Sequence, residues 1–217
     1  MVKEHNNKGF SLVELIIVIA ILAILSAAIA PALIRYINKA RKADDIATAD
    51  SIGTTVNAAY TDNEYVYDYI NEHVNWLVKE KGKNSGYLRI VGMMNAGYVY
   101  DGYHFTDIGN GVSHNLPGSV ETDGKNELKS ILEELMGEAI FKLKFTNNIY
   151  MDQWVICVDE QSRIHILCGA GLNGHQFYIK PNHILQGGAN NRLYQLWPSV
   201  DPEYNKLNVP PKEWDKD

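Results

Sequence analysis

A single acidic side chain, Glu14, stands near the start of an otherwise apolar run from Phe10 to Ala30. As a helix, this run is long enough to cross about 30 Å of hydrocarbon. A carboxylate inside hydrocarbon costs on the order of 2 to 4 kcal/mol unless it has a partner. No lysine or arginine lies one helical turn away. The nearest candidate cation is therefore an amino group made by cutting the chain after Gly9.

A second candidate site combines Cys157 and Cys168, which flank a short turn at residues 159–162. A hairpin would bring them onto neighbouring strands within reach of a disulfide. We expect this disulfide in preference to the second alternative, two free thiols. A zinc site shared with His165 and His175 is the third alternative, although the spacing fits no standard zinc pattern. The prediction is accordingly no metal and no cofactor.

A glycine-rich stretch at residues 169–174 fits the dinucleotide-binding pattern by its letters, Gly-Ala-Gly-Leu-Asn-Gly. That motif needs a helix directly after it, with an acidic residue about 20 positions further on. Here a strand-like stretch follows, and no acidic residue appears before Asp201. The sequence also contains no serine elbow and no metalloprotease helix, so we do not expect an enzyme.

Residues 8–16, Lys-Gly-Phe-Ser-Leu-Val-Glu-Leu-Ile, resemble the N-terminus of type IV prepilins and related pseudopilins. In that family a prepilin peptidase cuts between the positions matched by Gly9 and Phe10, and the new Phe10 amine is N-methylated. The residue matched by Glu14 pairs with the terminal amine of an adjacent subunit. Pro31 falls where many pilins carry a helix-softening proline. The resemblance covers residues 8–59.

The resemblance implies a structural subunit of a type IV pilus-like filament. Its partners would be other pilin subunits, the prepilin peptidase, a membrane assembly platform and, before assembly, membrane lipid. The precursor would be a single-pass cytoplasmic membrane protein with its head outside, and the assembled subunit would be extracellular, on the cell surface. Adhesion, motility, DNA uptake and secretion all stay open as roles. The alternatives are a minor pilin or secretion pseudopilin that primes or caps a filament, and a membrane-anchored adhesin or ligand-binding module.

Two plainer interpretations of the N-terminus compete with this resemblance. Residues 28–30, Ala-Ile-Ala, have the form of a signal-peptide cleavage site, but Pro31 would directly follow the cut and the leader carries little charge. A simple anchor would point its head inward by the positive-inside count, because four basic residues at 35–42 outnumber two in the leader. The resemblance instead places the leader in the cytoplasm, and we follow it.

Length and net charge indicate the number of domains and the class of partner. The 217 residues carry a net charge of −6 and suit one helix-anchored domain. Residues 61–217 hold 14 basic and 21 acidic side chains, and phosphate contacts need a basic surface. No nucleic-acid partner is therefore predicted.

The expected class is α+β and pilin-like, with a long N-terminal helix on an antiparallel sheet and additional helices. We expect a leader at 1–9, a helix at 10–60 and an α+β head at 61–217 with a proline-containing tail. Within the helix, 10–30 would cross the membrane and form the filament core, and about 46–60 would pack on the head. The packing stripe is Ile46, Ala49, Gly53, Val56 and Tyr60.

The head begins with a predicted second helix, opened by a capping box between Thr61 and Glu64 and stopped at Gly82. Its expected buried face is Val66, Tyr69, Ile70, His73, Val74 and Leu77. A third helix is expected from Lys125, after a loop at 107–122. Predicted strands are 87–91, 141–145, 150–158, 163–168 and 176–180, with a tight hairpin at 98–105 and a meander after the helices. From Trp197 the tail is expected to be extended or partly disordered.

Overall fold

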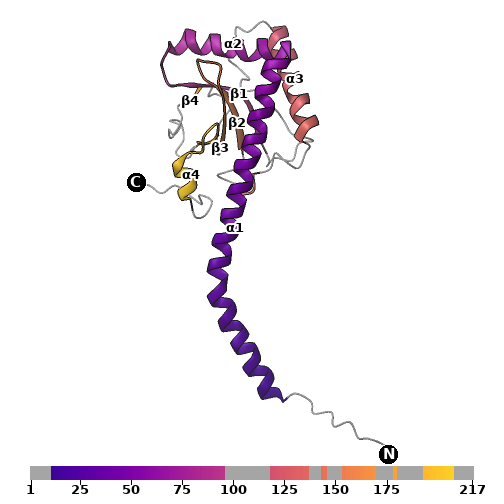
Figure 1. The fold of residues 1–217 in the computed structure, drawn as a ribbon, viewed down its shortest axis with the longest axis vertical. Coiled ribbons are helices and arrows are strands. Elements are labelled where there is room, and N and C mark those ends of the chain that lie inside the picture. Colours follow the sequence, from indigo (N-terminus) through magenta and orange to yellow (C-terminus); the bar gives the residue numbers. More distant parts are fainter. Residues whose placement is uncertain are drawn as a thin grey trace, which may run out of the picture. The chain divides into compact units, whose positions relative to one another are not determined.

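The structure is a computed structural model that describes residues 11–95, 118–136, 143–145, 153–169, 178–179 and 193–207. Within its first helix the chain divides into two compact units, Met1–Ala40 and Arg41–Asp217, and we call the second unit the head. The predicted α+β class, with a long N-terminal helix, an antiparallel sheet and further helices, is confirmed (Figure 1).

The first helix, α1 (Leu12–Asp62), is 51 residues long and runs through Pro31. In its part of the head, buried positions recur every three or four residues, which is the period of one helix face. They are Asp45, Ala49, Ile52, Gly53, Val56 and Ala59. Ile46 and Tyr60 are half-buried against the same core. This stretch of α1 therefore packs within the head.

The second helix, α2 (Glu64–Lys81), buries the six residues predicted for its inner face and ends at Gly82, which adopts φ 79°. The predicted capping box is wrong. The cap is Asn63, whose Oδ1 accepts hydrogen bonds from the amides of Tyr65 and Val66 at 3.0 and 3.2 Å. Thr61 remains inside α1 and donates its hydroxyl to the Asn57 carbonyl. The true cap lies two positions after the predicted one.

Five antiparallel strands form the sheet, in the order β4-β1-β2-β3-β5. Their bounds are β1 Leu88–Asn95, β2 Gln153–Val158, β3 Ile164–Gly169, β4 Tyr178–Ile179 and β5 Leu193–Trp197. The predicted hairpin of β2 and β3 is confirmed. The sheet is no simple meander, because β1 comes from before the third helix yet lies between β4 and β2.

The third helix, α3 (Gly118–Met136), starts seven residues before the predicted position. It replaces the C-terminal part of the expected loop. The tail prediction is also wrong for residues 197–207, since β5 is followed by a short helix, α4 (Pro202–Lys206), with Tyr204 fully buried. Residues 208–217 lie outside the described residues. Residues 143–145 form no strand, although Leu143 and Phe145 are buried and Lys144 is exposed, which is the alternation of a strand. The hairpin at 98–105 lies outside the described residues.

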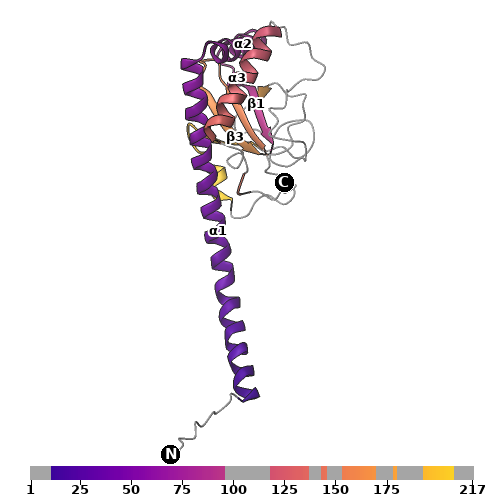
Figure 2. The same ribbon diagram turned by 90° about the vertical axis from the view of Figure 1, so that its right-hand side faces the viewer.

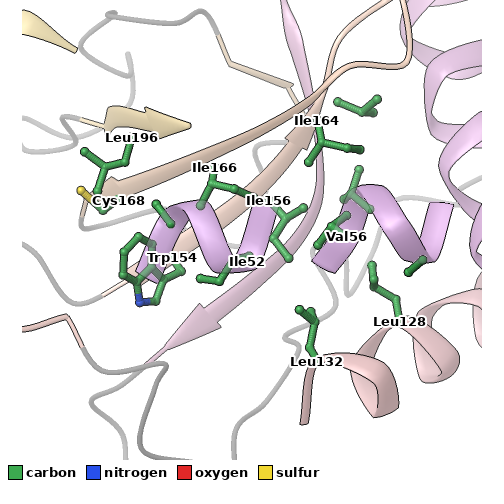
Figure 3. Packing of buried hydrophobic residues seen from close by; sticks show 14 of the residues in the cluster. Ile52, Val56, Leu128, Leu132, Trp154, Ile156, Ile164, Ile166, Cys168 and Leu196 are labelled. Atoms are coloured by element: carbon green, nitrogen blue, oxygen red, sulfur yellow. The ribbon is translucent and has the colours of Figure 1, made fainter. Parts of the chain in front are cut away.

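One face of the sheet carries the main core. The C-terminal half of α1, together with α2 and α3, covers this face (Figure 2). Figure 3 shows Ile52 and Val56 of α1 between Leu128 and Leu132 of α3 and the strands. The strand side chains in the same cluster include Trp154, Ile156, Ile164, Ile166, Cys168 and Leu196. A smaller cluster, which includes Val155, Cys157 and Leu167, lies on the opposite face.

Two charged residues of α1 tie distant parts of the head to the helix. Asp45 is 1% exposed, and its carboxylate accepts the amides of Lys144 and Phe145, each at 2.8 Å, and the Tyr204 hydroxyl at 3.2 Å. Lys42 donates to the carbonyls of Asn205 and Leu207 at 2.8 and 2.7 Å. These carbonyls end α4, where a cation also suits the helix dipole.

Gly53 is required for close contact between α1 and β5. A Cβ placed at Gly53 would lie 2.4 Å from the Trp197 ring. We expect Gly53→Ala to lower the free energy of unfolding by about 1 to 2 kcal/mol, because overpacking outweighs the helix propensity that alanine adds. Chemical denaturation of the full chain in detergent checks this, with Ser51→Ala on the exposed face as the control. An unchanged midpoint for Gly53→Ala would contradict this close contact.

Candidate functional site

The first turn of α1 contains a reciprocal pair of hydrogen bonds. The Ser11 amide donates to Glu14 Oε2 at 2.8 Å, and the Glu14 amide donates to Ser11 Oγ at 3.2 Å. This Ser-x-x-Glu pair is a capping box, and the spacing of Ser11 and Glu14 in the sequence is the signal for it. The carboxylate also lies at the end of the helix where the macrodipole favours negative charge.

Glu14 therefore has a local, neutral partner in the chain itself. The described residues offer it no cation within ion-pair distance. A carboxylate can accept about four hydrogen bonds, so the capping box leaves most of its capacity for another donor. An ammonium group from a second chain could thus be added without breaking the cap.

The apolar segment that follows Glu14 is uncovered. Every leucine, isoleucine and valine from Leu12 to Ile37 is exposed, from 42% for Ile37 to 73% for Leu12. Each such side chain gains roughly 1.5 to 3 kcal/mol on leaving water. Among the described residues, α1 is also the one helix that is long and apolar enough to cross a membrane. The segment must find lipid or protein to cover it.

Pro31 lies inside this segment without ending the helix. Since proline has no amide hydrogen, the carbonyl of Ala27, four residues earlier, lacks its usual helical donor. The local ladder is therefore one hydrogen bond short. Gly9 and Phe10, the predicted cleavage and methylation positions, lie outside the described residues.

The predicted disulfide is wrong. Cys157 and Cys168 are both buried free thiols. In the β2–β3 ladder, Cys157 pairs with His165 and Cys168 pairs with Trp154. Cys157 belongs to the smaller cluster and Cys168 to the main core, so the two thiols point to opposite faces of the sheet.

The same register argues against the zinc alternative, because thiols on opposite faces cannot share one metal ion. His165 is also engaged at both ring nitrogens. Nε2 lies 3.1 Å from Asp159 Oδ2, and Nδ1 lies 3.0 Å from Gln195 Oε1. No group of metal-binding side chains occurs among the described residues, and His175 lies outside them.

Asp159 organises the turn between β2 and β3. Burial opposes its charge, but the amide of Arg163 and the side chains of His165 and Arg163 donate to it, so the pKa of Asp159 is lowered. The Arg163 Nε lies 2.6 Å from Oδ2. This network explains His165 as a structural residue. Of the glycine-rich stretch, only Gly169 is described, as the last residue of β3.

Burial raises the pKa of both thiols, which suppresses the reactive thiolate. We expect negligible labelling of Cys157 and Cys168 by iodoacetamide in the folded chain. After denaturation without reductant, mass spectrometry should show two labels on each chain. No label under the same denaturing conditions would restore the disulfide.

Comparison with known protein families gives a match to one family model, at the N-terminus. The prokaryotic N-terminal methylation motif matches residues 5–30. This match spans residues 5–9 of the predicted leader, the predicted cleavage position, Glu14 and most of the exposed apolar segment. No solved structure matches the chain significantly.

These observations fit a membrane-anchored precursor with an N-terminal processing signal. That signal is the prepilin signal of type IV pilins and pseudopilins, and the chain contains it at residues 5–30. Such a signal implies other pilin subunits and processing by a prepilin peptidase in general, and it is typical of structural proteins.

Proposed function

We propose that this chain is a structural subunit of a type IV pilus-like filament. In this proposal the peptidase cuts after Gly9, the Phe10 amine is methylated, and α1 from Phe10 to about Tyr36 is buried among neighbouring helices. The observation that carries the proposal is the uncovered apolar segment from Leu12 to Ile37, directly after a methylation motif. Membrane lipid covers this segment before assembly, and neighbouring subunits cover it afterwards.

Glu14 distinguishes this proposal from a simple anchor. An anchor gains nothing from a carboxylate near hydrocarbon, which is expensive without a partner. In a filament, the carboxylate meets the Phe10 amine of a neighbour at one axial offset only, so it selects the register between subunits. Pro31 supports the same proposal, because the missing hydrogen bond lets the helix near Ala27 stretch while neighbours pack around it.

Mass spectrometry of material sheared from the cell surface tests the proposal. The expected N-terminal peptide begins at Phe10 and carries one added methyl group, while cells without prepilin peptidase retain residues 1–9. A dominant amount in sheared filaments identifies a major subunit, and a trace amount identifies a minor pilin or pseudopilin. An intact bond between Gly9 and Phe10, with the chain confined to the membrane, would favour the anchored adhesin or ligand-binding module instead.

A further inference from the structure

Exposed aromatic and acidic side chains are concentrated where α1 ends and α2 begins. Tyr65 and Tyr67 are 59% and 51% exposed, and Tyr67 stacks on Tyr60 with ring centroids 5.3 Å apart. Three exposed carboxylates lie within three residues of these tyrosines in the sequence, at Asp62, Glu64 and Asp68. We call these three carboxylates, with Tyr65 and Tyr67, the acidic corner.

A complementary set of charges precedes it on α1. Arg35, Lys39 and Arg41 are all exposed, and we call them the basic collar. Lys42 is not included, because it is occupied by the carbonyls that end α4. The sequence has no acidic residue from 15 to 43 and no lysine or arginine from 43 to 78. Opposite charges are therefore segregated into consecutive stretches of the chain.

Neither set is neutralised by a residue that the structure describes. Among the described residues, no ion pair involves a member of the collar or the corner. Both sets therefore remain available to an external partner. The corner suits arginine in particular, because guanidinium groups bind carboxylates in a forked geometry and stack on aromatic rings.

We propose that the basic collar of one copy docks on the acidic corner of another. This inference rests on the proposed filament, in which the α1 helices of neighbouring copies lie parallel. Copies in axial register would place collar beside collar and corner beside corner, which like-charge repulsion disfavours. Staggered copies place opposite charges together. The collar and the corner thus destabilise the unstaggered arrangement of subunits and stabilise the staggered one.

Carbodiimide cross-linking of filaments made by the unsubstituted chain tests this contact directly. The reagent joins an amine to a carboxylate as an amide with loss of water, and Lys39 is the primary amine of the collar. We expect dimers and higher oligomers on a denaturing gel, with Lys39 joined to Asp62, Glu64 or Asp68 in mass spectra. Lys39→Gln should lose this linkage. Filaments that contain no such linkage would overturn the proposal.

Charge reversal gives an independent measurement. We expect Arg35→Glu, Lys39→Glu and Arg41→Glu together to lower filament yield about tenfold or more, and likewise Asp62→Lys, Glu64→Lys and Asp68→Lys together. Combining all six should restore the yield to within about threefold. Lys79→Glu with Lys83→Glu, at the other end of α2, is the matched control and should assemble normally.

The outcomes separate this inference from the proposed function. Normal filaments from the collar variant alone or from the corner variant alone would overturn docking of collar on corner. So would a failure of the sixfold variant to restore the yield. Neither result would contradict the proposed function as a filament subunit. Weaker membrane retention with normal assembly would assign the collar to anionic lipid headgroups and also overturn it. If the unsubstituted chain is neither cut nor methylated and forms no filament, the proposed function itself is wrong.

Discussion

Replacement of Glu14 by alanine is expected to abolish filament assembly while membrane insertion and cleavage after Gly9 continue. In the membrane, an unpaired carboxylate is penalised by on the order of 2 to 4 kcal/mol, and docking on a neighbour's Phe10 amine removes that penalty. Alanine has no penalty to remove. The lost driving force corresponds to roughly 30- to 1000-fold at each contact between subunits. Electron microscopy of sheared filaments and the mass of the processed chain measure both parts of this expectation.

The capping box makes a sharper control possible. Glu14→Gln keeps an acceptor for the Ser11 amide, because glutamine serves at this position of a capping box, but it removes the charge. We expect Glu14→Gln to fail in assembly as Glu14→Ala does, whereas Ser26→Ala, at another polar position of the segment, should assemble. Normal filaments from Glu14→Gln would assign Glu14 to helix capping and contradict its role in register.

Elements that local pattern decides were predictable from the sequence. The buried face of α2 follows from apolar residues at helical spacing, and its end follows from Gly82, which can adopt a positive φ. The α+β class and the prepilin signal were predictable for the same reason, since each lies in a continuous stretch of residues. The cap of α2 was misplaced because Thr61 and Asn63 both have side chains suited to capping, and α1 extends past the first of them.

Contacts between distant residues were not predictable in this way. Spacing placed Cys157 and Cys168 on neighbouring strands, but only the register shows that Cys168 lies three residues beyond the partner of Cys157. An odd offset in a strand reverses the face. The tail was misjudged for a related reason, because Tyr204 is buried through contacts with Asp45, 159 residues earlier. Little in the local sequence of the tail reveals that partner.

Asp45→Ala is expected to cause the largest loss of stability in the head. It leaves the buried Phe145 amide and the Tyr204 hydroxyl without their acceptor, at about 1 to 3 kcal/mol each. Relief of the buried charge offsets part of this, so we expect a net loss of about 3 kcal/mol. Asp44→Ala is the matched control. Its carboxylate meets Lys144 Nζ at 3.5 Å on the surface, and such pairs contribute at most about 1 kcal/mol.

The pH dependence of this loss tests the state of the Asp45 carboxyl. Burial raises the pKa of Asp45 above the ordinary value of about 3.9, and outweighs the hydrogen bonds from Lys144, Phe145 and Tyr204 that lower it. The folded chain then holds this proton to higher pH than the unfolded chain, so the stabilisation by Asp45 is complete below about pH 3.9 and declines as pH rises through the folded pKa. Denaturant unfolding in detergent should therefore show a smaller gap between the unsubstituted chain and Asp45→Ala at pH 8 than at pH 4. A gap that grows with pH would mean that the three donors outweigh burial and favour the ionised form.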